Sequence, residues 1–358
     1  MILILNYWHL FKKRVAKIID VVLQFKQTNF PFVDPFTISN GRTKTHQPAL
    51  LVALSIGPFT GFGEAPAIQY YDITVEQMIN DLTQKQKLVE KFALTDPERY
   101  WHYLHHLFPK NPFLVSALDM AGWDLYGQMK AMPLYQLWQT EWSDDLPICD
   151  YTIGIDSIDK MVQKMLAKPW PIYKIKVGTP DDVQLIQSLR QHTTAKFRVD
   201  ANAGWTLDQA LAIIPALADL GVELIEQPLA KDNWDGMKVL FKQSPLPLFA
   251  DESCVAEQDV AKCAGYFHGI NIKLTKCSGI TPARRMIQAA KNLGLKIMMG
   301  SMNESVIGSA AIGHFLPQLD YVDMDGPLLL AEANATGVMY HDGKVSLSNR
   351  PGLGIAFQ

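Results

Sequence analysis

Cysteine, charge and long apolar runs are all scarce in this chain. Only 4 of its 358 residues are cysteine, and no two of them form a CxxC pair. This usage fits reduced thiols buried in a cytoplasmic protein better than disulfides or zinc ligands. Charged residues make up 19%, and 33 basic against 36 acidic side chains give a formal net charge of -3. Because no basic stripe is present, we do not expect nucleic acid as a partner.

The apolar start of the chain does not fit a membrane span or a secretory signal. Residues 1–11 are mostly apolar and are followed by Lys12, Lys13 and Arg14. A span needs roughly 20 apolar residues, and a secretory signal carries its charges before the apolar run. We interpret residues 1–16 as an N-terminal extension, with a membrane-surface tag as the alternative. We therefore expect no membrane partner.

Residues 17–145 predict an α+β domain. Alternating apolar and polar residues up to Glu64, broken by prolines and glycines, predict an antiparallel meander of short strands. Helical signals follow: Thr74 and Gln77 form a capping box, Asp96 precedes a proline that starts a second helix, and residues 112–129 have an apolar helical period.

A different period begins after Pro147. Eight short apolar runs end in polar or charged residues, and marked positions at 176, 200, 226, 251 and 273 are 24, 26, 25 and 22 residues apart. A helical pattern fits each gap, so residues 146–330 predict an α/β fold, a closed parallel barrel of βα units. A doubly wound open sheet is the rival, but no GxGxxG opens a helix after the first strand.

The end of the chain carries a hairpin signal. Asp342 and Gly343 stand between two alternating runs, which is typical of a tight β-turn. We expect this hairpin to pack back on the first domain, so that residues 331–358 complete it.

Three successive predicted strands end in a carboxylate: Asp200, Glu226 and Asp251. Carboxylates that meet at one mouth of a barrel repel each other unless a cation lies between them. An all-oxygen set without histidine or cysteine favours a hard ion, so we expect one Mg²⁺, with Mn²⁺ tolerated. The alternative is that these residues only cap the following helices.

Two other strands carry lysines: Lys174 and Lys176 on one, and Lys273 four strands further on. Because a closed barrel has no exposed edge, these side chains face the mouth from opposite sides, with the acidic strands between them. A lysine on each face of a substrate α-carbon could remove a proton and return one from the other side, through an enediolate that the cation and Lys174 stabilise. A neighbouring cation should also push a lysine toward its neutral form.

These motifs closely resemble the muconate-lactonizing subgroup of the enolase superfamily. The match runs from about Lys17 to the end, and it is carried by five motifs in order: Lys174-Ile175-Lys176, Val199-Asp200-Ala201-Asn202, Ile225-Glu226-Gln227-Pro228, Ala250-Asp251-Glu252-Ser253 and Asn271-Ile272-Lys273. The resemblance implies a modified TIM (β/α)7β barrel with an α+β capping domain. It also implies that Lys176 and Lys273 are the bases and that Lys174 supports the substrate carboxylate.

The pair Asp323 and Asp325 resembles the dipeptide epimerases, in which two such acids hold the free ammonium of the substrate. Two acids without a compensating side chain nearby in sequence suit a positive ligand. The alternative is a turn or helix-capping role before Gly326. Thr152 also matches a position that contacts substrate in those enzymes.

Other residues are expected to shape the pocket. Met302, with Met298 and Met299, could line an adaptable apolar wall. Arg42 lies close to a position where glutamate-specific family members carry an arginine for the substrate side chain, although the spacing from Phe36 is one residue longer. We expect residues 34–46 and 58–63 to cover the mouth and exclude water.

The sequence thus predicts a Mg²⁺-dependent isomerase, a cytoplasmic homo-oligomer that epimerises the C-terminal residue of L-Ala-D/L-Glu or a related L-Ala-Xxx dipeptide. A muconate cycloisomerase or an o-succinylbenzoate synthase on the same scaffold is the second enzyme hypothesis. A noncatalytic structural or binding protein is the third, and the complete set of lysines and acids argues against it.

Overall fold

A computed structural model describes residues 21–37, 43–331 and 335–357. The predicted extension at 1–16 and Arg42 lie outside these residues. The first part is an antiparallel sheet in the order β1 (Val22–Thr37), β2 (Thr43–Ile56) and β3 (Phe59–Pro66). These strands have 16, 14 and 8 residues, so the prediction of short strands was wrong. The prolines do not end β1 because it is an edge strand, where a missing N–H is tolerated, and its register shifts after Pro31.

Helices pack on one side of this sheet. They are the 3-10 turn η1 (Gln69–Tyr71), α1 (Val75–Glu90), α2 (Pro97–Leu107), α3 (Pro112–Lys130) and α4 (Leu134–Leu137). The capping box at Thr74 is confirmed, and the Asp96 carboxylate accepts a hydrogen bond from the Glu98 N–H. Helix α3 lies against β3, where a Cβ at Gly61 or Gly63 would collide with the backbone of α3. This close approach explains why glycine stands there.

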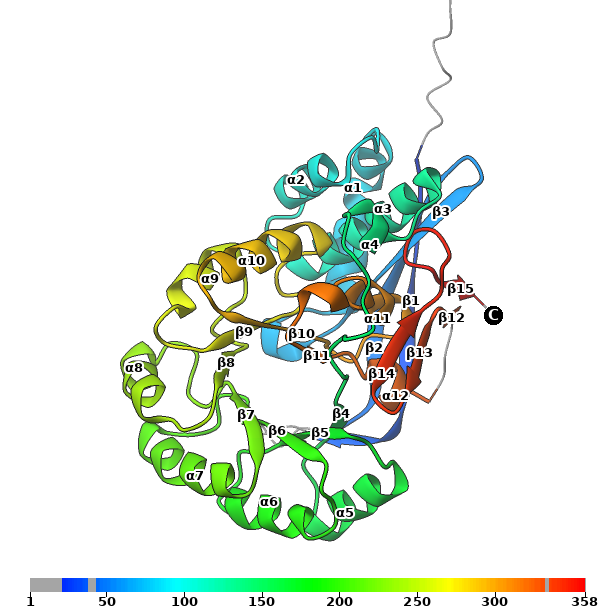
Figure 1. Cartoon of the computed structure of the whole chain (residues 1–358). Coiled ribbons are helices and arrows are strands. Elements are labelled where there is room, and N and C mark those ends of the chain that lie inside the picture. Colours follow the sequence, from blue (N-terminus) through cyan, green and yellow to red (C-terminus); the bar gives the residue numbers. More distant parts are fainter. Residues whose placement is uncertain (1–20, 38–42, 332–334, 358) are drawn as a thin grey trace, which may run out of the picture.

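The second part is an eight-stranded parallel barrel. Its strands are β4 (Tyr151–Ile153), β5 (Ile172–Lys176), β6 (Lys196–Asp200), β7 (Val222–Glu226), β8 (Leu248–Ala250), β9 (Gly269–Ile272), β10 (Lys296–Gly300) and β11 (Tyr321–Asp323). The main helices between them are α5 (Ile158–Ala167), α6 (Asp182–Arg190), α7 (Leu207–Asp219), α8 (Trp234–Gln243), α9 (Glu257–Cys263), α10 (Ile280–Asn292) and α11 (Val306–Gly313). Helices α5 to α10 form an outer ring, with the first part to one side (Figure 1).

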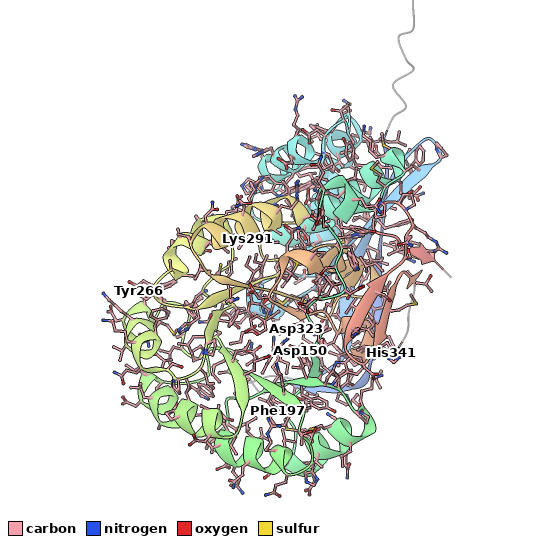
Figure 2. All side chains as sticks on the ribbon, viewed as in Figure 1. Asp150, Phe197, Tyr266, Lys291, Asp323 and His341 are labelled. Carbon is pink, nitrogen blue, oxygen red and sulfur yellow. The ribbon has the colours of Figure 1, made fainter. Side chains whose placement is uncertain are left out.

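A bridge between Cys149 and Val322 joins the two ends of the strand order, so the barrel nearly closes. Seven helices between eight strands give the (β/α)7β form, which confirms the predicted fold class. The interior is filled by side chains: Leu224, Phe249 and Met298 form an apolar cluster. Asp150 lies inside the ring, as does Asp323, whereas Tyr266 and Lys291 lie on its rim (Figure 2). The Asp150 carboxylate pairs with Arg198 Nη1 at 2.8 Å.

The predicted C-terminal hairpin forms from β13 (Val338–His341) and β14 (Lys344–Leu347). Asp342 and Gly343 both have positive φ, at 48° and 75°, as the tight turn requires. The hairpin packs on α11 of the barrel and not on the first part of the chain, which corrects that expectation. Only the segment after it reaches α3, where the Leu353 N–H donates to the Asp124 carboxylate at 2.8 Å.

Among residues 21–37, 43–331 and 335–357, no helix combines the length and the apolar character needed to cross a membrane. All four cysteines are free thiols and buried, as their scarcity and spacing predicted.

Candidate active site

Three carboxylates converge at the mouth of the barrel. Asp200 and Glu226 end β6 and β7, and Asp251 follows β8 directly. Asp200 is paired in register with Glu226, so both side chains emerge at the same level. One oxygen from each of the three residues lies within 4.8 Å of the others, and all three residues are buried. The sequence placed these acids on successive parallel strands, and the structure brings them together.

The chemistry of this acidic triad fits a hard divalent cation. All donors are carboxylate oxygens, which Mg²⁺ prefers. Burial and the charge of Asp200 raise the pKa of Glu226 against the opposing charge of Lys174. Lys174 Nζ lies 2.8 Å from Glu226 Oε2. A carboxylate oxygen has two lone pairs, so Oε2 can bind a cation in addition to Lys174.

Lysines lie on both sides of the acidic triad. Lys176 Nζ pairs with Asp200 Oδ2 at 2.6 Å on the β5 side, and Lys273 Nζ pairs with Asp251 Oδ2 at 2.7 Å on the β9 side. Strands β6, β7 and β8 separate these two lysines. Lys174 lies deeper, 3% exposed, with Nζ 2.8 Å from Glu226 and 2.7 Å from Asp323.

The charge state of these lysines depends on the carboxylates. Burial is the largest single effect on Lys273 and lowers its pKa, but Asp251, Glu226 and Asp200 together raise the pKa more, so the net shift is upward. Burial and the acids around Lys174 have the same opposing effects, and its pKa also lies well above the ordinary value. The expectation of a neutral lysine depended on the charge of a metal ion, which the carboxylates alone do not supply.

Sequence analysis missed a fourth lysine in the site. Lys276 is fully buried and donates to the Asp251 carboxylate, to the Cys254 carbonyl at 3.1 Å and to the Asn271 carbonyl at 3.3 Å. Asn271 in turn donates from Nδ2 to Glu226 Oε1 at 2.8 Å. Two acids of the triad are thus held by partners from the β9 segment. No spacing rule predicted this, because Lys276 lies in a turn after the strand.

We expect Lys276→Met to reduce the free energy of unfolding by about 3 kcal/mol or more, because it leaves the buried Asp251 with one cationic partner fewer. Adding Mg²⁺ should restore part of the lost stability, since a bound cation supplies the missing positive charge. Urea unfolding followed by circular dichroism, in chelator and in Mg²⁺, measures both. The matched control is Lys262→Met on α9, whose exposed ammonium pairs with Asp259, and which should leave stability nearly unchanged. Equal stability of the two variants would contradict the prediction.

Asp323 and Asp325 differ in their surroundings. No compensating side chain lies near these two acids in the sequence, but Asp323 pairs with Lys174, which is distant in sequence and adjacent in the barrel. Asp325 has no cationic partner among the described residues, and burial together with Asp323 raises the pKa of Asp325 to about 7. Its Oδ2 accepts the Thr152 N–H at 2.6 Å. Asp325 stands at the start of α12 (Gly326–Leu329) without capping it, so the capping alternative is not supported.

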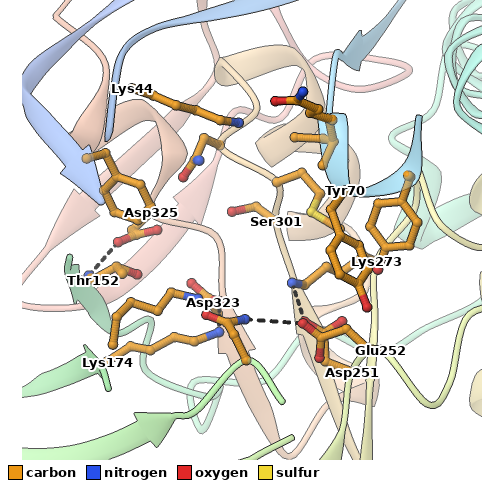
Figure 3. A pocket seen from close by; sticks show the side chains of 18 residues that line it. Lys44, Tyr70, Thr152, Lys174, Asp251, Glu252, Lys273, Ser301, Asp323 and Asp325 are labelled. Carbon is orange, nitrogen blue, oxygen red and sulfur yellow. Dashed lines mark hydrogen bonds and ion pairs between the residues drawn. The ribbon is translucent and has the colours of Figure 1, made fainter. Parts of the chain in front are cut away.

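Most of these groups line one pocket, whereas Asp200, Glu226 and Lys276 are not among its lining residues. Thr152, Lys174, Lys176, Asp251 and Lys273 line it, together with Asp323 and Asp325 (Figure 3). Glu252, which follows Asp251, also lines it.

The walls of this pocket differ in part from the predictions. Met302 lines it, whereas Met298 and Met299 are buried in the barrel and do not. Of the two segments expected to cover the mouth, residues 34–46 contribute Phe36 and Lys44. Residues 58–63 contribute nothing, because their glycines are packed on α3. Residues 68–71 line the pocket instead, and their two tyrosines carried no signal in the sequence.

Comparison with known proteins shows a consistent set of relatives. Residues 157–358 match the family described as "Enolase C-terminal domain-like". The L-Ala-D/L-amino acid epimerase of Flavobacterium johnsoniae is 50% identical over 93% of this chain and 98% of its own length.

Solved structures that resemble this chain include other dipeptide epimerases. A substrate-liganded L-Ala-D/L-Glu epimerase from Bacillus subtilis superimposes with a TM-score of 0.87 at 29% identity, covering 94% of this chain and 98% of that chain. A dipeptide epimerase from Enterococcus faecalis, complexed with Mg and L-Leu-L-Tyr, gives a TM-score of 0.85 at 29% identity, covering 94% and 99%.

Proposed function

The chain belongs to the enolase C-terminal domain-like family, and on this premise we propose that it is a Mg²⁺-dependent dipeptide epimerase. It inverts the α-carbon of the C-terminal residue of L-Ala-D/L-Xxx dipeptides. The observation that carries this proposal is the placement of Lys176 and Lys273 on opposite sides of the acidic triad. Such a pair can reach both faces of one carbon.

Inversion follows from two bases and one planar carbon. One lysine removes the α-proton, and the carbon becomes planar as its electron pair spreads into the neighbouring carboxylate as an enediolate. The other lysine returns a proton to the opposite face. The reverse reaction exchanges the two roles, so each lysine serves one stereoisomer of the substrate.

The negative charge that develops on the substrate carboxylate needs fixed positive groups. Lys174 supplies an ammonium in a dry position next to Glu226, where its charge is weakly screened. Mg²⁺, when held by Asp200, Glu226 and Asp251, supplies a Lewis acid for the same carboxylate. Tyr70 and Tyr71 from the first part of the chain line the pocket and limit access of water.

Asp325 supports a substrate with a free amine. It is a buried acid without a cationic partner among the described residues, beside the lysine-paired Asp323. A dipeptide ammonium supplies the missing charge. The substrates of a muconate cycloisomerase or an o-succinylbenzoate synthase have no ammonium, so this acid favours the epimerase over both alternatives.

The test uses free and N-acetylated L-Ala-L-Xxx dipeptides in D₂O with Mg²⁺. We expect α-deuterium incorporation and epimerisation of the free dipeptides only, measured by NMR. Asp325→Asn should lower kcat/KM for free dipeptides by on the order of 30-fold, since a desolvated ammonium loses its partner. The matched control is Asp320→Asn, just before β11, where Asp320 pairs with Lys296 at 2.7 Å. Equal turnover of free and acetylated dipeptides would contradict the proposal that Asp325 binds the substrate ammonium.

Cytoplasmic location is also our proposal, supported by four cysteines that are all free thiols. It stays a prediction that the protein forms a homo-oligomer and that its domain limits lie at residues 16, 145 and 330. The change from an antiparallel sheet to a parallel barrel between α4 and β4 supports the limit at 145.

A further inference from the structure

Lys44 stands apart from the other charged groups of the pocket. It lies on β2, outside the barrel, and its side chain lines the pocket. Figure 3 shows it reaching in from the side opposite Lys174. Among the described residues, its ammonium donates one hydrogen bond, to Gln47 Oε1 at a long 3.4 Å, and it pairs with no carboxylate. The other lysines of the pocket, Lys174, Lys176 and Lys273, all have acidic partners within 3.0 Å.

The surroundings of Lys44 favour an anionic ligand. The amide side chains Gln69 and Asn303 line the same pocket and can donate hydrogen bonds, while Phe36, Ile68 and Met302 provide apolar surface. Burial lowers the pKa of Lys44, as expected for an ammonium that is mostly removed from water without a counter-charge. A carboxylate carried on a short apolar stem would match both the charge and the apolar surface.

The geometry of the reaction directs the substrate side chain toward this region. When the α-carbon is planar, its three substituents lie in one plane between Lys176 and Lys273. The carboxylate points to the acidic triad and Lys174, and the peptide nitrogen leads to the ammonium at Asp323 and Asp325. The third substituent is the side chain, for which the rest of the pocket remains, and the first part of the chain contributes Lys44 to its lining there.

We propose that Lys44 is a specificity-determining residue that binds the side-chain carboxylate of an acidic residue at the epimerised position. This inference rests on the proposed function, and it narrows the substrates to dipeptides with a C-terminal glutamate or aspartate.

The test compares two substrates of nearly equal shape, L-Ala-L-Glu and L-Ala-L-Gln, on the full chain with Mg²⁺. For the unmodified protein we expect kcat/KM to be about tenfold or more higher for the glutamate dipeptide. Lys44→Met should bring this ratio close to one, and Lys44→Glu should reverse the charge preference so that L-Ala-L-Lys is turned over faster than L-Ala-L-Glu. Lys26→Met, an exposed lysine of the same sheet on β1, is the matched control and should keep the full ratio.

Two results would overturn the inference while leaving the epimerase intact. One is that the unmodified protein has the same kcat/KM for the glutamate and glutamine dipeptides. The other is that the preference for the glutamate dipeptide is kept in Lys44→Met and lost in Arg42→Met. Absence of epimerisation with every dipeptide would instead overturn the proposed function, and this inference with it.

Discussion

Replacing Lys273 by alanine is expected to lower epimerisation by at least about 10³-fold and to leave proton exchange with only one stereoisomer of the substrate. Lys176 still reaches its own face of the α-carbon in this variant, so it exchanges the proton of one epimer but cannot complete the inversion. Lys176→Ala should show the opposite pattern. A positioned general base contributes roughly 10²- to 10⁴-fold, and here each direction needs both groups.

The measurement follows α-proton exchange of each pure epimer in D₂O by NMR, separately from optical rotation. Lys273→Arg is the matched variant: it keeps a positive charge beside Asp251 but cannot act as a base at neutral pH, so it should be as inactive as the alanine variant. Recovery of turnover in Lys273→Arg would assign Lys273 an electrostatic role only. Exchange of the same epimer by both alanine variants would contradict the two-base mechanism.

The acidic triad and the lysines could be predicted because one rule of the fold controls them. In a parallel barrel, the residues at the carboxyl ends of the strands meet at one mouth, whatever their distance along the chain. Asp200, Glu226 and Lys176 end their strands, and Asp251 and Lys273 follow theirs directly. Counting the repeat was therefore sufficient to place them together.

Residues outside this repeat could not be predicted in the same way. Lys276 comes from a turn, and Tyr70 comes from a 3-10 turn of the first part of the chain. Their positions depend on how that part docks on the barrel, and the periodic pattern of the sequence does not predict this docking. The pairing of Lys174 with Asp323 was missed for a related reason, because β11 comes next to β4, and so near β5, only when the barrel closes.

One segment expected to cover the mouth proved to be a strand. Residues 58–63 were expected to form a loop there, but Gly61 and Gly63 lie in β3 against α3. Glycine in a strand often marks close approach of another backbone, and this reason applies here. The mouth is instead covered by residues 68–71, which follow that strand.

Glu226→Gln is expected to weaken Mg²⁺ binding by more than the 10- to 100-fold that loss of an outer hydrogen-bond partner costs. The substitution preserves the shape of the side chain, and its amide oxygen remains available. It removes one negative charge from the acidic triad, whose attraction for a divalent cation depends on the sum of the three carboxylates. The measurement is a calorimetric titration with Mg²⁺, or with Mn²⁺ followed by electron paramagnetic resonance, so it does not depend on turnover.

The same strand offers the control for this measurement. Glu223 also lies on β7, but its carboxylate pairs with Arg198 and Lys196, away from the acidic triad. Glu223→Gln makes the same chemical change and should leave Mg²⁺ affinity within about twofold, because its partly exposed charge lies outside the pocket and is already paired with two cations. Activity of the unmodified protein should disappear in excess chelator and return with Mg²⁺. Undiminished metal affinity in Glu226→Gln, or full activity in chelator, would contradict metal binding by the acidic triad. The charges of the buried acids would then be balanced by Lys174, Lys273 and Lys276 alone.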